Sequence, residues 1–159
     1  MPKAKGASKT SAGLLMVRRC GVSWEFLLAH PGGPFFARKD DGAWSVPKGL
    51  PEGEEDLLAA AKREFVEETG FDCESDTYLP LGHVVQAGGK TVHAWAFVGD
   101  CRPEELKSNT FMLEWPPKSG RMREVPEIDR VAFFDAERAR VKMNPAQSAF
   151  IDRALALLR

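Results

Sequence analysis

Carboxylates crowd one short stretch of the sequence. The 23 residues from Gly49 to Phe71 hold six glutamates and one aspartate, but only one lysine and one arginine. The whole chain has a formal net charge of only -1, so its other residues carry a net positive charge. Carboxylates without accompanying histidine or cysteine are hard oxygen ligands, which suit Mg²⁺ or Mn²⁺ better than zinc. The stretch therefore predicts a site for a hard divalent cation.

The second half of this stretch has the spacing of a helix. Leu58, Ala61 and Phe65 recur at intervals of three and four residues, as on the apolar face of a helix. We expect the helix to run from Glu54 to Thr69 and Gly70 to end it, because glycine readily adopts the left-handed backbone of a helix C-terminus. Acidic residues in the first turn would suit the helix dipole.

Three glutamates share one face of that helix. At roughly 100° per residue, Glu64, Glu67 and Glu68 lie at about 0°, 300° and 40° around the axis. Like charges at these spacings repel by roughly 0.2 to 0.5 kcal/mol per pair. A solvated acidic face is the plain alternative, but a bound cation would turn the repulsion into attraction. Mg²⁺ held by a few carboxylates keeps open positions for substrate phosphates, as in phosphoryl-transfer enzymes.

Apolar runs on both sides predict the elements that position this helix. The expected strands are Ala12 to Val17, Trp24 to His30, Leu81 to Gln86, Thr91 to Val98, Phe111 to Trp115 and Arg130 to Phe134. Asp135 can cap a short helix, and Asn144 followed by Pro145 opens a last one. Strands around one central helix, with a closing helix, indicate an α/β domain with a mixed sheet.

Length and composition bound the number of domains and the class of partner. A chain of 159 residues with 43% hydrophobic content fits one buried core. We expect a flexible basic tail at residues 1–10 and a single domain at residues 11–159. The near-neutral charge speaks against binding to duplex nucleic acid, and the apolar runs are too short to cross a membrane. The oligomeric state is left open.

The cysteines and histidines are scattered along the chain. The cysteines are odd in number and lack a C-x-x-C pair, so we expect neither a disulfide framework nor a zinc site. They are Cys20, Cys73 and Cys101. This usage fits a reducing, cytoplasmic setting. We interpret the three histidines as structural or surface residues rather than ligands: His30, His83 and His93.

Nine residues of the acidic stretch also match the Nudix box, G-x5-E-x7-R-E-U-x-E-E-x-G-U, in which U is a bulky apolar residue. They are Gly49, Glu55, Arg63, Glu64, Phe65, Glu67, Glu68, Gly70 and Phe71. The chain resembles the Nudix hydrolase family in this box. The order of the flanking strands and the closing helix also resembles the Nudix fold, an α/β/α sandwich with a mixed β-sheet.

The resemblance implies a set of metal ligands and a reaction. It implies that Glu64, Glu67 and Glu68 bind Mg²⁺, or Mn²⁺ in its place, helped by the backbone carbonyl of Gly49. Two further residues resemble supporting positions of the family: Arg63 orients a box carboxylate, and Glu55 supports the metal loop. In such a reaction a metal-activated water attacks phosphorus in line and expels a nucleotide, and a carboxylate takes the proton.

The carboxylate that takes the proton is open between the helix and a loop. Glu67 belongs to the box, whereas Glu124 and Glu127 lie in the segment SGRMREVPEIDR, just before a predicted strand. We favour Glu127 as the loop base, with Glu67 close behind. The alternative for Glu127 is an ion pair with one of three nearby arginines: Arg121, Arg123 or Arg130.

The sequence says less about the substrate. Lys48, directly before the box, can contact a polyphosphate, and this P-K-G entry resembles Nudix hydrolases of diadenosine polyphosphates and related bacterial nucleotide pyrophosphohydrolases. Leu50 departs from that pattern, because many diadenosine tetraphosphate hydrolases have histidine there. Gln86 stands sixteen residues past Gly70, where enzymes of ADP-ribose and of long dinucleoside polyphosphates tend to carry proline or tyrosine.

A long loop from His30 to Trp44 offers further contacts for a nucleotide. Long loops in compact domains are often functional. The candidate residues are Phe36, Arg38, Lys39 and Trp44, the aromatic ones because a base can stack on them. For Trp95, in an alternating strand, we favour packing in the core.

Two functions from different classes follow. The first is a magnesium-dependent hydrolase of a dinucleoside polyphosphate or a nucleoside triphosphate, with ADP-ribose or a nucleotide sugar as alternative substrates. The second is a catalytically silent Nudix-fold module that binds a nucleotide or a protein. Such modules usually lose box carboxylates, and this box keeps all of them, so we favour the enzyme.

Overall fold

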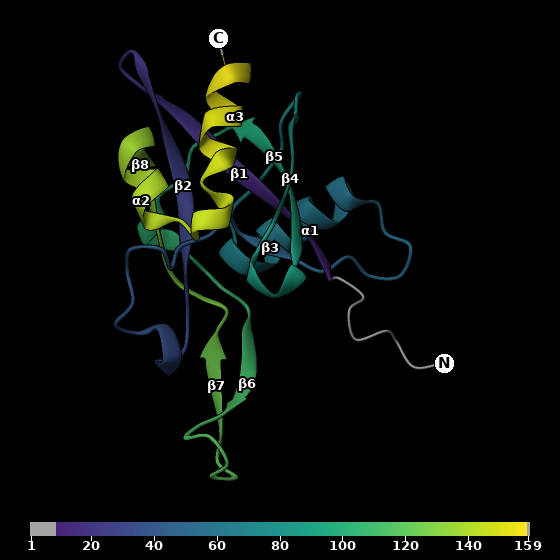
Figure 1. The fold of residues 1–159 in the computed structure, drawn as a ribbon, viewed down its shortest axis with the longest axis vertical. Helices are drawn as coiled ribbons and strands as arrows, with labels where there is room; N and C mark the ends of the chain where they lie inside the picture. Colours follow the sequence, from purple (N-terminus) through teal and green to yellow (C-terminus); the bar gives the residue numbers. More distant parts are fainter. Residues whose placement is uncertain (1–8, 159) are drawn as a thin grey trace.

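The computed structural model describes residues 9–158. The strands are β1 (Thr10–Cys20), β2 (Ser23–Pro31), β3 (Lys48–Gly49), β4 (Leu79–Val85), β5 (Thr91–Val98), β6 (Thr110–Glu114), β7 (Met122–Pro126) and β8 (Ile128–Asp135). The helices are α1 (Leu57–Thr69), α2 (Ala136–Lys142) and α3 (Ala149–Leu157), as Figure 1 shows. The expected tail at residues 1–10 lies outside the described residues except for Lys9 and Thr10, and Thr10 already begins β1.

The central sheet is mixed, as expected. Its strand order is β4-β5-β1-β2-β8, and β3 pairs with β1 beside this path. The pairing of β1 with β5 is parallel, whereas the other pairings of the sheet are antiparallel. Because β3 attaches to β1, the chain enters the acidic stretch directly from the centre of the sheet.

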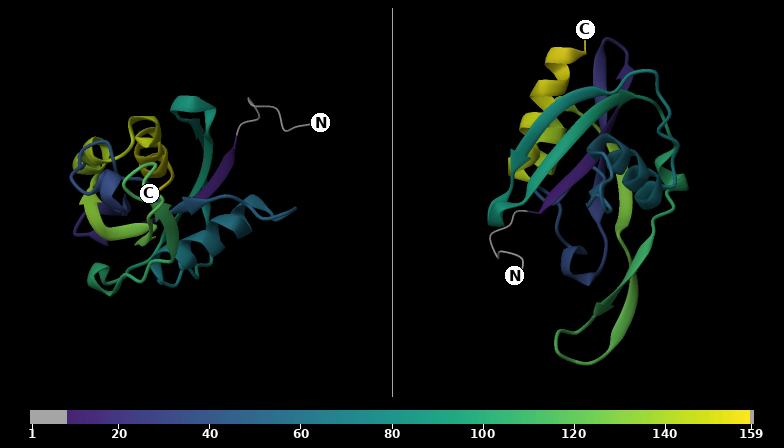
Figure 2. Two further views of the ribbon diagram at one scale, coloured as in Figure 1. Left: turned by 90° about the horizontal axis from the view of Figure 1, so that it is seen from below. Right: turned by 90° about the vertical axis from the view of Figure 1, so that its right-hand side faces the viewer.

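Helices cover both faces of this sheet, each over its own apolar core. Successive side chains of a strand point to opposite faces. On β1, Leu14 and Met16 pack into the core under α1, whereas Leu15 and Val17 pack into the core that includes residues of α2 and α3. The three layers are visible in Figure 2. This arrangement confirms the expected α/β/α sandwich.

The first helix begins later than predicted. It starts at Leu57, and the side chain of Asp56 accepts a hydrogen bond from the Ala59 amide at 3.1 Å, which caps the helix. The predicted acidic first turn is therefore wrong, because the glutamates before Asp56 belong to the preceding loop. The predicted end is confirmed, since Gly70 caps the helix with a left-handed backbone of φ 76°.

Two C-terminal elements also differ from prediction. The strand expected from Phe111 to Trp115 exists as β6, but it pairs with β7 in a separate two-stranded sheet, which projects from one end of the molecule (Figure 1). Asn144 and Pro145 open a short 3-10 turn rather than the last helix, and α3 begins only at Ala149. Among residues 9–158, no helix has the length and apolar character needed to cross a membrane. The cysteines are free thiols.

Candidate active site

The segment that enters the acidic stretch is held from both sides. On β3, Lys48 pairs with Gly13 and Gly49 pairs with Ala12 of β1. Just upstream, the amide of Val46 donates to the side-chain oxygen of Gln147 at 3.0 Å. Lys48 and Gly49 are thereby fixed beside α1.

Gly49 lies against the carboxylate of Glu64. A Cβ atom placed on Gly49 would stand 2.0 Å from Cδ of Glu64 and 2.2 Å from its Oε1, far inside contact distance. Only glycine leaves the Glu64 carboxylate room in this position. The backbone of Gly49 and the side chain of Glu64, which the resemblance assigned to one metal site, are therefore in contact.

Arg63 ties the loop before the helix to the glutamates of the helix. Its guanidinium donates two hydrogen bonds of 2.9 Å to Glu55 and one of 3.0 Å to the carbonyl of Leu50. It also donates to Glu64 at 3.0 Å and to Glu67 at 3.2 Å. The hydrogen bonds to Glu55 raise the pKa of Arg63, and those same bonds lower the pKa of Glu55 to about 2. Charge-assisted paired contacts of this kind fix geometry as well as charge.

A recess opens beside β3, and we call it the carboxylate recess. Its volume is about 150 Å³, and it is lined by Ala29, Pro31, Ser45, Val46, Lys48, Glu68, Glu127 and Ile128. Three of its four polar lining residues are ionisable: Lys48, Glu68 and Glu127. They come from β3, from α1 and from the turn between β7 and β8.

Burial and mutual repulsion shift the pKa values of the carboxyl groups in this site. Burial first, and then the charges of Glu64 and Glu127, raise the pKa of Glu68 to about 8. Burial also raises the pKa of Glu64 and of Glu127. It lowers the pKa of Lys48, which faces all three carboxylates. Acids whose charged forms are this costly mark a candidate functional site.

The structure separates the three helix glutamates that the sequence placed together. The Glu64 side chain is 14% exposed and the Glu67 side chain 44% exposed, and both accept from Arg63. Glu68 instead lines the recess with Glu127. An ideal helical projection shows the common side of the three residues but not which carboxylates other elements bury.

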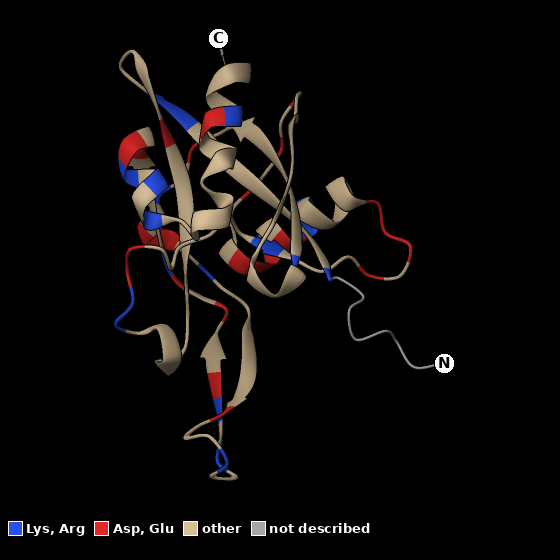
Figure 3. Cartoon of the chain, in the orientation of Figure 1, with Lys and Arg blue, Asp and Glu red and all other residues tan. Residues whose placement is uncertain are grey.

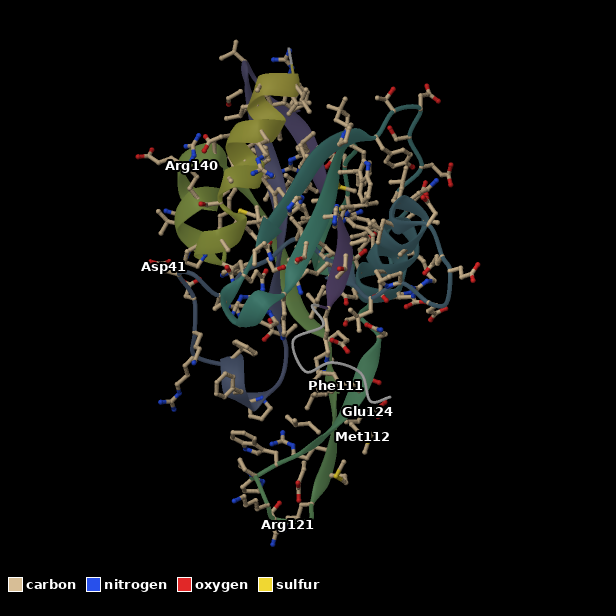
Figure 4. All side chains as sticks on the ribbon, turned by 45° about the vertical axis from the view of Figure 1, so that its right-hand side comes forward. Asp41, Phe111, Met112, Arg121, Glu124 and Arg140 are labelled. Atoms are coloured by element: carbon tan, nitrogen blue, oxygen red, sulfur yellow. The ribbon has the colours of Figure 1, made fainter. Side chains whose placement is uncertain are left out.

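The two candidates for a loop base lie in different surroundings. Glu127 lines the carboxylate recess, and the positive charge that faces it is Lys48 rather than a neighbouring arginine. Glu124 is exposed on the β6–β7 hairpin, where it accepts a hydrogen bond of 2.6 Å from Thr110. Figure 4 shows Glu124 on this hairpin with Phe111 and Met112.

Residues 32–43, which we call the Gly-Pro loop, hold the other predicted substrate contacts. Arg38 and Lys39 are exposed, and Phe36 is half-buried. Phe35, which was not among the predicted contacts, is 58% exposed, and the ammonium of Lys39 lies 4.2 Å from its ring centre. For two adjacent phenylalanines in a loop, the sequence pattern does not predict which ring is exposed.

Trp44 does not fit the role predicted for it. Its side chain belongs to the core, and the residue is only 4% exposed. The ring meets Phe134 edge-on at 5.1 Å, and its Nε1 donates to Asp40 at 2.8 Å. A nucleobase cannot stack on a ring covered in this way, so the predicted contact with Trp44 is wrong. Trp95 packs against the other core, as expected.

The donor atoms around the recess suit a hard cation, although the side chains are not arranged around a single point in this structure. In the described part of the chain, no three side chains of histidine, cysteine, aspartate or glutamate are close enough to hold a metal ion. Glu64 and Glu67 direct oxygens to Arg63 instead. The carboxylate oxygens of Glu64, Glu67 and Glu68 and the backbone carbonyl of Gly49 are hard oxygen donors, which fit Mg²⁺ or Mn²⁺.

Comparisons with known proteins agree with the fold. The family described as NUDIX domain matches residues 7–154. No curated protein matches the sequence significantly. An Ap4A hydrolase of C. elegans, solved as a binary complex, is 21% identical over 94% of this chain and 97% of that chain, with a TM-score of 0.62.

Two further solved structures share this fold. The NUDIX domain of Shewanella oneidensis NrtR, in complex with ADP ribose, is 14% identical over 96% of this chain and 90% of that chain, with a TM-score of 0.63. A MutT protein from Methanosarcina mazei is 20% identical over 96% of each chain, with a TM-score of 0.59. Since the family match spans nearly the whole chain and every box carboxylate is present, the chain belongs to the Nudix family, and its site supports a pyrophosphohydrolase.

Proposed function

We propose that the protein hydrolyses a phosphoric anhydride bond in a compound built on a nucleoside diphosphate, with Mg²⁺ as cofactor. The proposed substrate is a dinucleoside polyphosphate of the diadenosine tetraphosphate type or a nucleoside triphosphate. The observation that carries this proposal is the carboxylate recess, where Glu68 and Glu127 meet Lys48 beside Glu64.

The charge balance of this site favours a cationic cofactor and an anionic substrate together. The pKa of Glu68 is raised to about 8 by burial and by its neighbours, so its ionised form needs compensating positive charge. Glu64, Glu67, Glu68 and the carbonyl of Gly49 would hold the metal ion, with Glu67 exchanging its contact with Arg63 for the metal. A bound Mg²⁺ would neutralise phosphate charge and acidify a water molecule.

The residues of the chain would then carry the proton and orient the phosphates. Glu127 takes a proton from the attacking water as the new bond from oxygen to phosphorus forms and the anhydride bond breaks. The negative charge moves onto the leaving phosphate. Lys48 contacts a phosphate oxygen from the other side of the recess. A base that takes this proton typically contributes about 10² to 10⁴ in rate.

The Gly-Pro loop would meet the part of the substrate beyond the recess. Lys39 and Arg38 offer positive charge to the outer phosphates, and Phe35 or Phe36 offers a face on which a base can stack. The C. elegans enzyme with a similar fold is named as an Ap4A hydrolase, and this supports trying that substrate first.

The proposal is tested by assaying the purified protein with and without Mg²⁺ on diadenosine tetraphosphate, nucleoside triphosphates, ADP-ribose and nucleotide sugars. We expect Mg²⁺-dependent release of a nucleotide from at least one of the first two. Glu68→Gln should abolish most of this turnover, whereas Glu54→Gln, in the exposed loop before the helix, should leave it unchanged. Binding of a nucleotide without turnover on any substrate would overturn the enzyme and support the silent module.

A further inference from the structure

One histidine joins two segments of the proposed site. His30, at the end of β2, is completely buried, and both of its ring nitrogens have partners. Nδ1 lies 2.8 Å from Oδ1 of Asp129, and Nε2 lies 2.6 Å from the carbonyl oxygen of Lys39. The ring therefore bridges the Gly-Pro loop and the start of β8.

The chemistry of these two partners defines the bridge. A backbone carbonyl can only accept a hydrogen bond, so Nε2 donates to Lys39. The other ring nitrogen, Nδ1, makes a second hydrogen bond, with the carboxyl group of Asp129. An apolar side chain of similar size, such as leucine, has no polar atom and could hold neither partner.

Both partners lead to residues with a proposed role in the reaction. Lys39 belongs to the Gly-Pro loop, which also carries Phe35 and Phe36. Asp129 follows Glu127 by two residues, and the carbonyl of Glu127 accepts a hydrogen bond of 3.0 Å from the amide of Gly32. The loop is thus tied to the Glu127 segment twice, once through its backbone and once through the ring of His30.

The surrounding side chains leave His30 little freedom. Its ring meets the buried ring of Trp44 edge-on at 5.2 Å. Trp44 in turn donates to Asp40, the residue after Lys39, at 2.8 Å. The end of the Gly-Pro loop is therefore held through both rings, since His30 is linked to Asp129 at the start of β8 and Trp44 meets Phe134 further along the same strand.

We propose that His30 is a positioning residue that assembles the substrate loop and the catalytic carboxylate as one unit. The inference rests on the proposed role of Glu127 as the base. The side chain of His30 is completely buried, so its proposed role is not a direct contact with the substrate. It acts by fixing where Glu127 stands relative to the loop that grips the outer part of the substrate, and a misplacement of about 1 Å can cost about 10²-fold in rate.

A double-mutant cycle tests whether His30 acts through Glu127. His30→Leu should lower kcat by about tenfold to 100-fold, as expected for a displaced catalytic group. In the Glu127→Gln background, the same change should have almost no further effect on kcat, because residues that act as a unit are not additive. Fully additive losses would overturn the positioning role and leave His30 as a structural residue.

A second variant and a control guard against simple misfolding. His30→Gln retains a donor for one partner and should fold with an intermediate loss of kcat. His83→Leu, which removes a largely exposed histidine on β4, should leave the kinetics unchanged. Wild-type kcat in both His30 variants would overturn the proposal.

A measurement that needs no activity tests the link itself. Trypsin should cut after Arg38 and Lys39 faster in folded His30→Leu than in the wild type, because the loop has lost one of its anchors. The cleavage rate after Arg121, on the β6–β7 hairpin, provides an internal control and should not change. An equal rate at Lys39 in both proteins would overturn the bridge. Full activity in Glu127→Gln would instead overturn the proposed base, and the trypsin rates distinguish that failure from a failure of the bridge.

Discussion

The carboxylate recess and the projecting segments differ in how their side chains are held. In the recess, Glu68 and Glu127 are half-buried, their pKa values are raised, and they come from α1 and from the turn that leads into β8. The Gly-Pro loop and the β6–β7 hairpin instead carry exposed aromatic, methionine and basic side chains at the end of the molecule away from α3 (Figure 3). The first region holds ionisable carboxyl groups in partly buried positions, and the second presents exposed side chains to solvent.

This difference matches the division of work expected in an enzyme. Groups that move a proton must be fixed to within a fraction of an ångström, and a rigid scaffold supplies that precision. Groups that select a substrate are often carried by loops on such a scaffold. We therefore expect changes in the recess to lower kcat strongly, and changes in the projecting segments to alter KM moderately.

The largest expected effect is the loss of the base. Glu127→Gln keeps the size of the side chain but cannot accept the proton, so kcat should fall by about 10² to 10⁴. The measurement is steady-state hydrolysis at saturating Mg²⁺, with metal binding checked separately by titration.

Glu124→Gln is the matched control, because Glu124 lies in the same segment but on the exposed hairpin. It should change kcat by less than about threefold, since surface substitutions away from a site have small effects. Equal losses from the two variants would erase the distinction between recess and hairpin.

The second effect concerns the contact between Gly49 and Glu64. Gly49→Ala would place a Cβ atom 2.0 Å from Cδ of Glu64 and force this carboxylate away. We expect activity to fall by about 10²-fold or more, as for a displaced catalytic group. Leu50→Ala, at the neighbouring exposed position, should retain activity. A Gly49→Ala variant as active as the wild type would show that activity does not require the Glu64 carboxylate to lie against residue 49.

Much of the recess could be predicted because its information is local. The spacing of Leu58, Ala61 and Phe65 specifies one helix, and Gly70 ends it. The match of nine residues to the Nudix box then assigned roles to positions only a few turns apart. Within one helix and its entry loop, residue spacing is nearly the same as residue geometry.

What could not be predicted depends on contacts between distant segments. Burial of Glu68 beside Glu127 requires the turn before β8 to pack near α1. The spacing of residues along the chain does not predict this contact between distant segments. Trp44 looked like a loop aromatic, yet it is buried because β8 supplies Phe134 against its ring. His30 gave no signal because its partners, Lys39 and Asp129, are ordinary surface residue types.

A third prediction concerns stability and pH in the recess without metal. The pKa of Glu68 is about 8 in the folded protein and 4.5 in its ordinary state. The folded state therefore binds this proton more tightly, so the contribution to stability is complete below pH 4.5 and is lost as pH rises through 8. With a chelator present to remove metal ions, the free energy of unfolding should fall between pH 4.5 and pH 8 by up to about 1.4 kcal/mol per pH unit.

Urea unfolding of the wild type and of Glu68→Gln at several pH values measures this slope. The variant should show a flatter dependence, and Mg²⁺ should flatten that of the wild type because the ion replaces the proton. Glu54→Gln, outside the recess, should keep the wild-type slope. If Glu68→Gln also keeps the wild-type slope, then Glu68 is not the group whose titration sets the pH dependence of stability.

The smallest expected effect lies on the Gly-Pro loop and decides which phenylalanine meets the substrate. Phe35 is the more exposed of the pair and has Lys39 over its ring, so Phe35→Ala should raise KM for a dinucleoside polyphosphate by about fivefold, near the lower end of what base stacking contributes. The kcat should hardly change, because the ring is remote from the proton transfer. Met122→Ala, on the hairpin, is the control of similar exposure. A larger rise in KM from Phe36→Ala than from Phe35→Ala would restore the residue that the sequence favoured, and a fall in kcat from either would show that the projecting loop takes part in the chemistry of the recess.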